Sequence, residues 1–97
     1  MNPEKQIIQF MLDVIHCVRG EYHMNSMSMP KRHIAQALER ANKCLTAQLY
    51  FPELQFKPWY LKNAFIHAIL HASPYLGWKG HIVAREAIDT IRASLPW

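Results

Sequence analysis

Three histidines in the C-terminal half have the spacing of a metal site. His67 and His71 are four residues apart, which places both imidazoles on one face of a helix, and His81 follows as a possible third ligand. The alternative is a set of solvated or packed histidines, because no Asp or Glu lies between Leu54 and Arg85 to orient a ring nitrogen. We therefore expect no metal and no other cofactor, and keep these histidines as the metal candidates.

The same part of the chain is basic and aromatic, a combination that can bind an anionic or apolar partner. Lysines can meet phosphate groups while aromatic rings stack on bases, and a solvated basic face is the alternative. The nucleic-acid interpretation requires Lys57, Lys62 and Lys79 to share one exposed face. We expect a ligand or partner to contact Lys57, Trp59, Tyr60, Lys62, His67, His71, Tyr75, Trp78, Lys79 and His81.

Aromatic residues crowd the link that precedes this region. In a small protein such side chains more often fill the core than face a ligand, because they bury the most apolar area per residue. We therefore expect core packing from Tyr50, Phe51, Phe56, Trp59 and Tyr60.

Four helices are expected to position these residues, over residues 3–19, 30–49, 58–72 and 78–94. Pro3 and Pro30 suit the first helical position, where the missing N–H costs nothing. Gly20 is expected to end the first helix in the left-handed conformation that glycine adopts most cheaply. The chain is predicted to be all-α, a compact single domain over residues 1–97.

Apolar residues recur at helical spacing and predict the buried stripe of each helix. The stripes of the first and second helices are Ile7, Phe10, Met11, Val14, Ile15 and Val18, then Ile34, Leu38, Ala41, Leu45 and Leu49. That of the third is Leu61, Phe65, Ala68, Ile69 and Ala72, widened by Ile66 and Leu70, and that of the fourth is Ile82, Ala84, Ala87, Ile88, Ile91 and Leu95.

Chain length, composition and net charge narrow the class of protein. A chain of 97 residues builds one core, and its 51% apolar content leads us to expect a homodimer that shares part of the apolar surface. A net charge of +4 favours anionic partners. Two isolated cysteines, Cys17 and Cys44, without a basic and apolar leader predict a cytoplasmic protein with reduced thiols. No apolar run reaches membrane-helix length, so we expect solubility and no membrane partner.

Residues 61–92 resemble the C-terminal half of the carboxymuconolactone decarboxylase and alkylhydroperoxidase D-like families. The residues that carry this resemblance are His71, Ala72, Pro74, Tyr75, Gly77 and Trp78. The resemblance implies an all-helical, oligomer-forming fold. The resemblance assigns no catalytic residue. Cys44 has no second cysteine nearby to form the Cys-x-x-Cys pair of the peroxidase family, and only His33 lies in a local sequence similar to that of the decarboxylase histidine.

No catalytic constellation is evident, and this favours a non-enzymatic function. Our first hypothesis is a small helical interaction protein, a regulator or inhibitor that binds a partner protein. A second is a divergent decarboxylase-like enzyme or ligand-binding domain, with His67, His71, Tyr75 and His81 around a pocket at the turn over residues 74–80. A third is a nucleic-acid-binding protein with a basic aromatic face.

Overall fold

The computed structural model describes residues 3–23 and 29–94. Within these ranges the helices are α1 (Pro3–His23), α2 (Met29–Tyr50), α3 (Pro58–Ala72) and α4 (Trp78–Ala93), and there is no strand. Two short 3-10 turns, η1 (Pro52–Leu54) and η2 (Ser73–Tyr75), lie in the connections around α3. The predicted all-α fold of four helices is confirmed.

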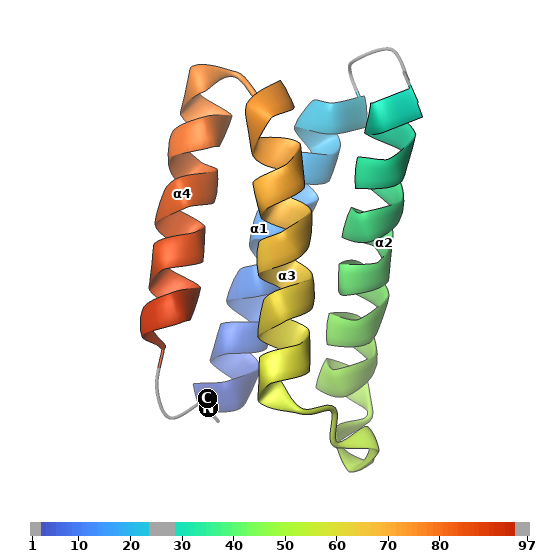
Figure 1. The fold of residues 1–97 in the computed structure, drawn as a ribbon. Helices are drawn as coiled ribbons and strands as arrows, with labels where there is room; N and C mark the ends of the chain where they lie inside the picture. Colours follow the sequence, from blue (N-terminus) through green and yellow to red (C-terminus); the bar gives the residue numbers. More distant parts are fainter. Residues whose placement is uncertain (1–2, 24–28, 95–97) are drawn as a thin grey trace.

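The four helices form an up-and-down bundle, with each helix antiparallel to the one before it (Figure 1). In that view α3 lies in front of α1, and α2 and α4 flank the pair on opposite sides. Short connections impose this order, because a short link leaves the next helix beside the last one. The described residues span 38 × 23 × 19 Å. None of the helices in the described part of the chain is both long and apolar enough to cross a membrane.

The core runs along the inner faces of all four helices. Phe65, in the middle of α3, is fully buried in one cluster with Met11 of α1, Leu38 of α2 and Ile91 of α4. The five main residues of the stripe predicted for the third helix are buried, but of the two residues expected to widen it Ile66 is half-buried and Leu70 is 48% exposed. The stripe of the second helix is buried apart from Leu49, which is half-buried against the core. The spacing of apolar residues therefore predicts most of the buried faces of α2 and α3 correctly.

Helix α1 is longer than predicted. It continues through Gly20 and ends at His23, so the expected cap at Gly20 is wrong. Glycine permits a left-handed cap but does not require one, and inside a helix it costs only about 1 kcal/mol relative to alanine. The neighbouring residue types, Glu21 and Tyr22, also tolerate a helix, so the chain continues in it.

Two other predicted core residues, besides Leu70, lie at the surface. Phe10 is 37% exposed, whereas Ile8 and Leu12 are buried in α1 although the predicted stripe omits them. The buried face of α1 is therefore rotated about the helix axis from the predicted face. It includes Ile8 and Leu12, and Phe10 lies at its edge. Ile82 is 46% exposed, because it lies about 200° around α4 from buried Ala84. Leu95, from the same predicted stripe, lies outside the described residues.

Candidate functional site

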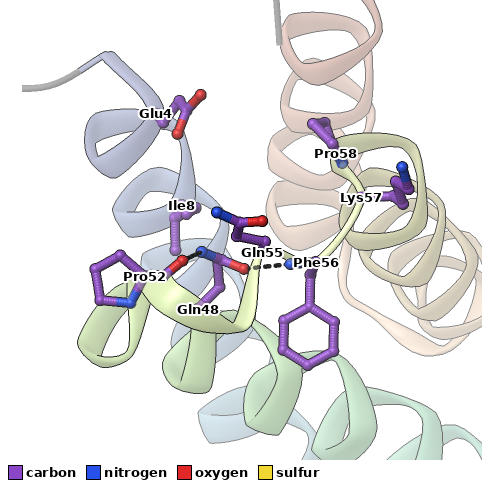
Figure 2. Close-up of a pocket in the computed structure, with 8 residues that line it drawn as sticks. All are labelled: Glu4, Ile8, Gln48, Pro52, Gln55, Phe56, Lys57 and Pro58. Carbon is purple, nitrogen blue, oxygen red and sulfur yellow. Dashed lines mark hydrogen bonds between the residues drawn. The ribbon is translucent and has the colours of Figure 1, made fainter.

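The connection between α2 and α3 is held by one side chain, Gln48. Its Oε1 accepts a hydrogen bond from the backbone N–H of Phe56 at 2.7 Å, and its Nε2 donates to the carbonyl of Pro52 at 3.4 Å (Figure 2). Within the connection, the N–H of Leu54 donates to the carbonyl of Phe51 at 3.0 Å. The connection is therefore an ordered turn, fixed to the end of α2.

Gln55 reverses the chain in this turn. Its backbone has φ 52° and ψ 49°, the left-handed conformation, and its N–H donates to the carbonyl of Pro52 at 3.2 Å. For a residue with a Cβ this conformation costs about 1–2 kcal/mol. The turn persists because the Gln48 hydrogen bonds and the 3-10 turn fix the residues on either side. The reversal then lets α3 start at Pro58 beside α2.

This ordered turn displays large apolar side chains to solvent. Five of them are between 45 and 69% exposed: Tyr50, Phe51, Leu54, Trp59 and Tyr60. We call these residues the Tyr50–Tyr60 surface. The prediction that the aromatics of this link fill the core is wrong for all of them except Phe56, which is half-buried against the core. The turn lies beyond the end of the bundle, where no helix of the described chain covers it.

Ring contacts order part of the Tyr50–Tyr60 surface. Phe56 and Tyr60 are stacked, with ring centroids 6.1 Å apart and an interplanar angle of 11°. Trp59 meets Tyr60 edge to face at 6.2 Å and 79°. Such offset and edge-to-face pairs are favourable beyond their buried area. Tyr60 thus links the exposed Trp59 to the half-buried Phe56, and the three rings form one continuous apolar feature.

A cavity of about 390 Å³ adjoins this surface, between the start of α1, the end of α2 and the turn. Figure 2 shows its lining, which consists of Glu4, Ile8, Gln48, Pro52, Gln55, Phe56, Lys57 and Pro58. The volume suits a small ligand or an inserted side chain. The lining offers one carboxylate, one ammonium and two carboxamides, and neither a thiol, a hydroxyl nor an imidazole. These groups are suited to hydrogen bonds and ion pairs with a bound ligand or an inserted side chain.

The structure separates the three candidate histidines. The rings of His67 and His71 are neighbours, with centroids 4.3 Å apart. His67 faces α2, where it lines a groove with Arg40 and Cys44. His81 is on α4, and its Nδ1 lies 2.7 Å from the Oγ of Ser73. Nowhere in residues 3–23 and 29–94 do three His, Cys, Asp or Glu side chains gather in a way that could hold a metal.

Tyr75, Trp78 and Lys79, of the other predicted binding residues, lie at the opposite end of the bundle, where η2 joins α3 to α4. Tyr75 and Trp78 are exposed there, and the Nζ of Lys79 lies 5.6 Å from the Trp78 ring centroid, a cation–π distance. Lys57, by contrast, precedes α3 at the Tyr50–Tyr60 end. Lys62 is half-buried and donates from Nζ to the carbonyl of Ser94 at 3.2 Å. The single exposed face predicted for Lys57, Lys62 and Lys79 is therefore wrong.

Four residues of structural interest were not among the predicted site residues: Gln48, Ser73, Arg85 and Arg92. Gln48 gives no signal in the sequence, because a glutamine at the end of an amphipathic helix is unremarkable. Arg92 does give one, since His81, Arg85 and Arg92 are four and then seven residues apart and so share one face of α4.

Comparisons of this chain with protein families, with curated proteins and with solved structures give no match. The resemblance of residues 61–92 to the decarboxylase-like families stays a prediction.

Proposed function

We propose that the protein binds a partner protein through the Tyr50–Tyr60 surface and acts as a small regulator or inhibitor in the cytoplasm. The observation that carries this proposal is the exposure of five large apolar side chains within eleven consecutive residues. Single apolar residues at a surface are ordinary, whereas a cluster marks an interaction site. Tyrosine and tryptophan are also the residues enriched at the energetic centres of protein interfaces.

The rigidity of the turn supports the same function. Gln48 fixes the turn by two hydrogen bonds, and Tyr60 contacts both Phe56 and Trp59. A surface that is already ordered loses little conformational entropy on binding, so more of the contact energy appears as affinity. The adjoining cavity offers a place for a side chain of the partner.

The charge of the protein favours an acidic partner. The chain carries +4, and at the Tyr50–Tyr60 surface the exposed Glu53 balances Lys57, so the excess positive charge comes from the rest of the chain. A second copy would bring the same net charge to the contact, whereas an acidic rim on another protein would be attracted. The partner should therefore present an apolar centre surrounded by Asp and Glu. The homodimer expected from composition stays a separate prediction.

Tagged protein purified from its own host after nuclease treatment, and weighed by native mass spectrometry, tests the proposal. We expect a complex with one other protein that Trp59→Ala weakens by tenfold or more, about the effect of losing one interface hot spot. The matched control is Trp78→Ala, because Trp78 is similarly exposed but lies at the opposite end of the bundle. This control should leave the affinity within about twofold.

Two results would contradict the proposal. One is a partner that binds the Trp59→Ala and Trp78→Ala proteins equally well. The other is a homodimer that dissociates in the Trp59→Ala protein, since the Tyr50–Tyr60 surface would then be a contact between two copies. Circular dichroism of both variants shows whether the fold is intact.

A further inference from the structure

A groove runs between α3 and α4, two helices that lie side by side (Figure 1). It contains a cavity of about 400 Å³ lined by Leu70, Ser73, Pro74, His81, Arg85, Ile88, Asp89 and Arg92. A second cavity of about 370 Å³ is lined by Trp59, Lys62, Asn63, Ile66 and Arg92. Because Arg92 borders both cavities, they are neighbouring parts of one surface feature, which we call the α3–α4 groove.

The α3–α4 groove is basic. Arg85 and Arg92 both line the larger cavity, and neither forms a salt bridge or hydrogen bond with any residue in the described part of the chain. Asp89 is the only acid in either lining. Two guanidinium groups without a carboxylate partner are suited to an anion, and their planar forks match the oxygens of a phosphate.

A buried hydroxyl orients a third polar group in the larger cavity. Ser73 is only 7% exposed, and its Oγ lies 2.7 Å from Nδ1 of His81. When Ser73 donates this hydrogen bond, the neutral imidazole carries its proton on Nε2. The remaining ring nitrogen is then a donor whose direction is fixed by Ser73. His81 lies on the same face of α4 as Arg85, one turn away.

The remaining residues that line the larger cavity are three apolar residues and one acid, and neither kind would be expected in a site for free phosphate alone. Leu70, Pro74 and Ile88 form an apolar wall, which can cover a sugar or a base. The Asp89 carboxylate would repel a phosphate but can accept hydrogen bonds from sugar hydroxyls, as acidic residues do for ribose in nucleotide sites. The volume of about 400 Å³ lies in the range of small-molecule pockets.

From these features we propose that the α3–α4 groove binds a nucleotide unit. The phosphate lies against Arg85, Arg92 and His81, and the ribose hydroxyls face Asp89. The unit is a free mononucleotide or one residue of a single strand. In a strand, the next base reaches the second cavity, where Trp59 offers an exposed ring for stacking beside Lys62. Trp59 belongs both to this second cavity and to the Tyr50–Tyr60 surface, whereas Arg85 and Arg92 are not part of that surface, so changes at the two arginines test the nucleotide site separately from the proposed protein partner.

Fluorescence anisotropy with a short labelled oligouridylate at low salt tests this inference, with UMP, deoxyuridine monophosphate and inorganic phosphate as competitors. We expect Arg85→Gln and Arg92→Gln each to weaken binding about tenfold, as for one charge-assisted hydrogen bond. The slope of log affinity against log salt should fall in magnitude by about 0.7 for each phosphate group that the variant no longer neutralises. Displacement by UMP identifies a mononucleotide site, whereas binding of the oligonucleotide alone identifies a strand.

Arg32→Gln and Lys43→Gln are the matched controls, because both residues are exposed on α2, outside the α3–α4 groove. With the variants compared at about 0.15 M salt, where the Debye length is about 8 Å, they should change the affinity less than about twofold, since exposed charges beyond that length are largely screened. Asp89→Ala should remove a preference for UMP over its deoxy form, because it leaves no side-chain acceptor for the ribose 2′-hydroxyl. The inference is overturned if neither UMP nor the oligonucleotide binds, if inorganic phosphate competes as well as UMP, or if the controls weaken binding as much as Arg85→Gln. Equal binding of the deoxy competitor overturns the contact to Asp89.

Discussion

Replacing Gln48 by leucine should destabilise the turn that carries the Tyr50–Tyr60 surface. Leucine has nearly the same volume but can neither accept from the N–H of Phe56 nor donate to the carbonyl of Pro52. The bond to Phe56 is short, at 2.7 Å, and its loss leaves a part-buried N–H without an acceptor, which costs about 1–3 kcal/mol. The bond to Pro52 is long, at 3.4 Å, and exposed, so it adds about 0.5 kcal/mol at most.

The expected total is about 2 kcal/mol for Gln48→Leu, which corresponds to a fall in Tm of about 8–15 °C for a domain of this size. Urea denaturation followed by circular dichroism measures the free energy, and hydrogen exchange at the Phe56 amide measures the local opening. Gln48→Glu is the informative comparison, because its carboxylate still accepts from Phe56 and loses only the weaker bond. The reasoning fails if Gln48→Leu costs less than about 0.5 kcal/mol, or if Gln48→Glu costs as much.

Three further changes test the packing, the backbone and the surface charge of the bundle. Phe65→Ala should cost about 3–5 kcal/mol, because it opens a cavity at the centre of the core, and chemical denaturation measures this. Gln55→Gly should stabilise the protein by up to about 1 kcal/mol, since glycine adopts the left-handed conformation without a Cβ clash; a lower Tm would contradict this. Arg19→Gln removes the 3.0 Å ion pair with Glu39 of α2, which is partly exposed, and should cost less than about 1 kcal/mol. Loss of this effect at high salt would confirm its electrostatic origin.

The positions of the helices follow from local chemistry, and these are what the sequence predicts best. Pro58 and the period of the apolar residues place α3 at its observed bounds, Pro58–Ala72. Gly20 shows the limit of such signals, because a glycine can end a helix or continue it at a cost of about 1 kcal/mol. Which of these outcomes occurs depends on how the whole bundle packs, and a local sequence pattern carries no information about that packing.

The exposed side chains could not be predicted, for a different reason. A helical period shows which residues share a face, but whether another element covers that face depends on the whole fold. Phe10 fits the period and still lies at the surface, at the edge of the arc that its neighbours bury, whereas Ile82 lies on the side of α4 opposite to its buried residues. Trp59 and Tyr60, in the first turn of α3, are exposed on the sides of this helix that border cavities with α4 and α2. The α3–α4 groove was missed because residues from two helices form it, and only the spacing of Arg85 and Arg92 on α4 was visible in the sequence.

The up-and-down order of the helices also affects how the chain folds. Each helix packs beside the one before it in sequence, so only short loops must close before most side chains meet. Bundles with such local contacts fold within microseconds to milliseconds. The α2–α3 hairpin has the most extensive packing, whereas α4 packs less closely and joins α1 from the far end of the chain. The turn braced by Gln48 thus belongs to the hairpin expected to form first, and the segment that displays the aromatic side chains is also where folding should begin.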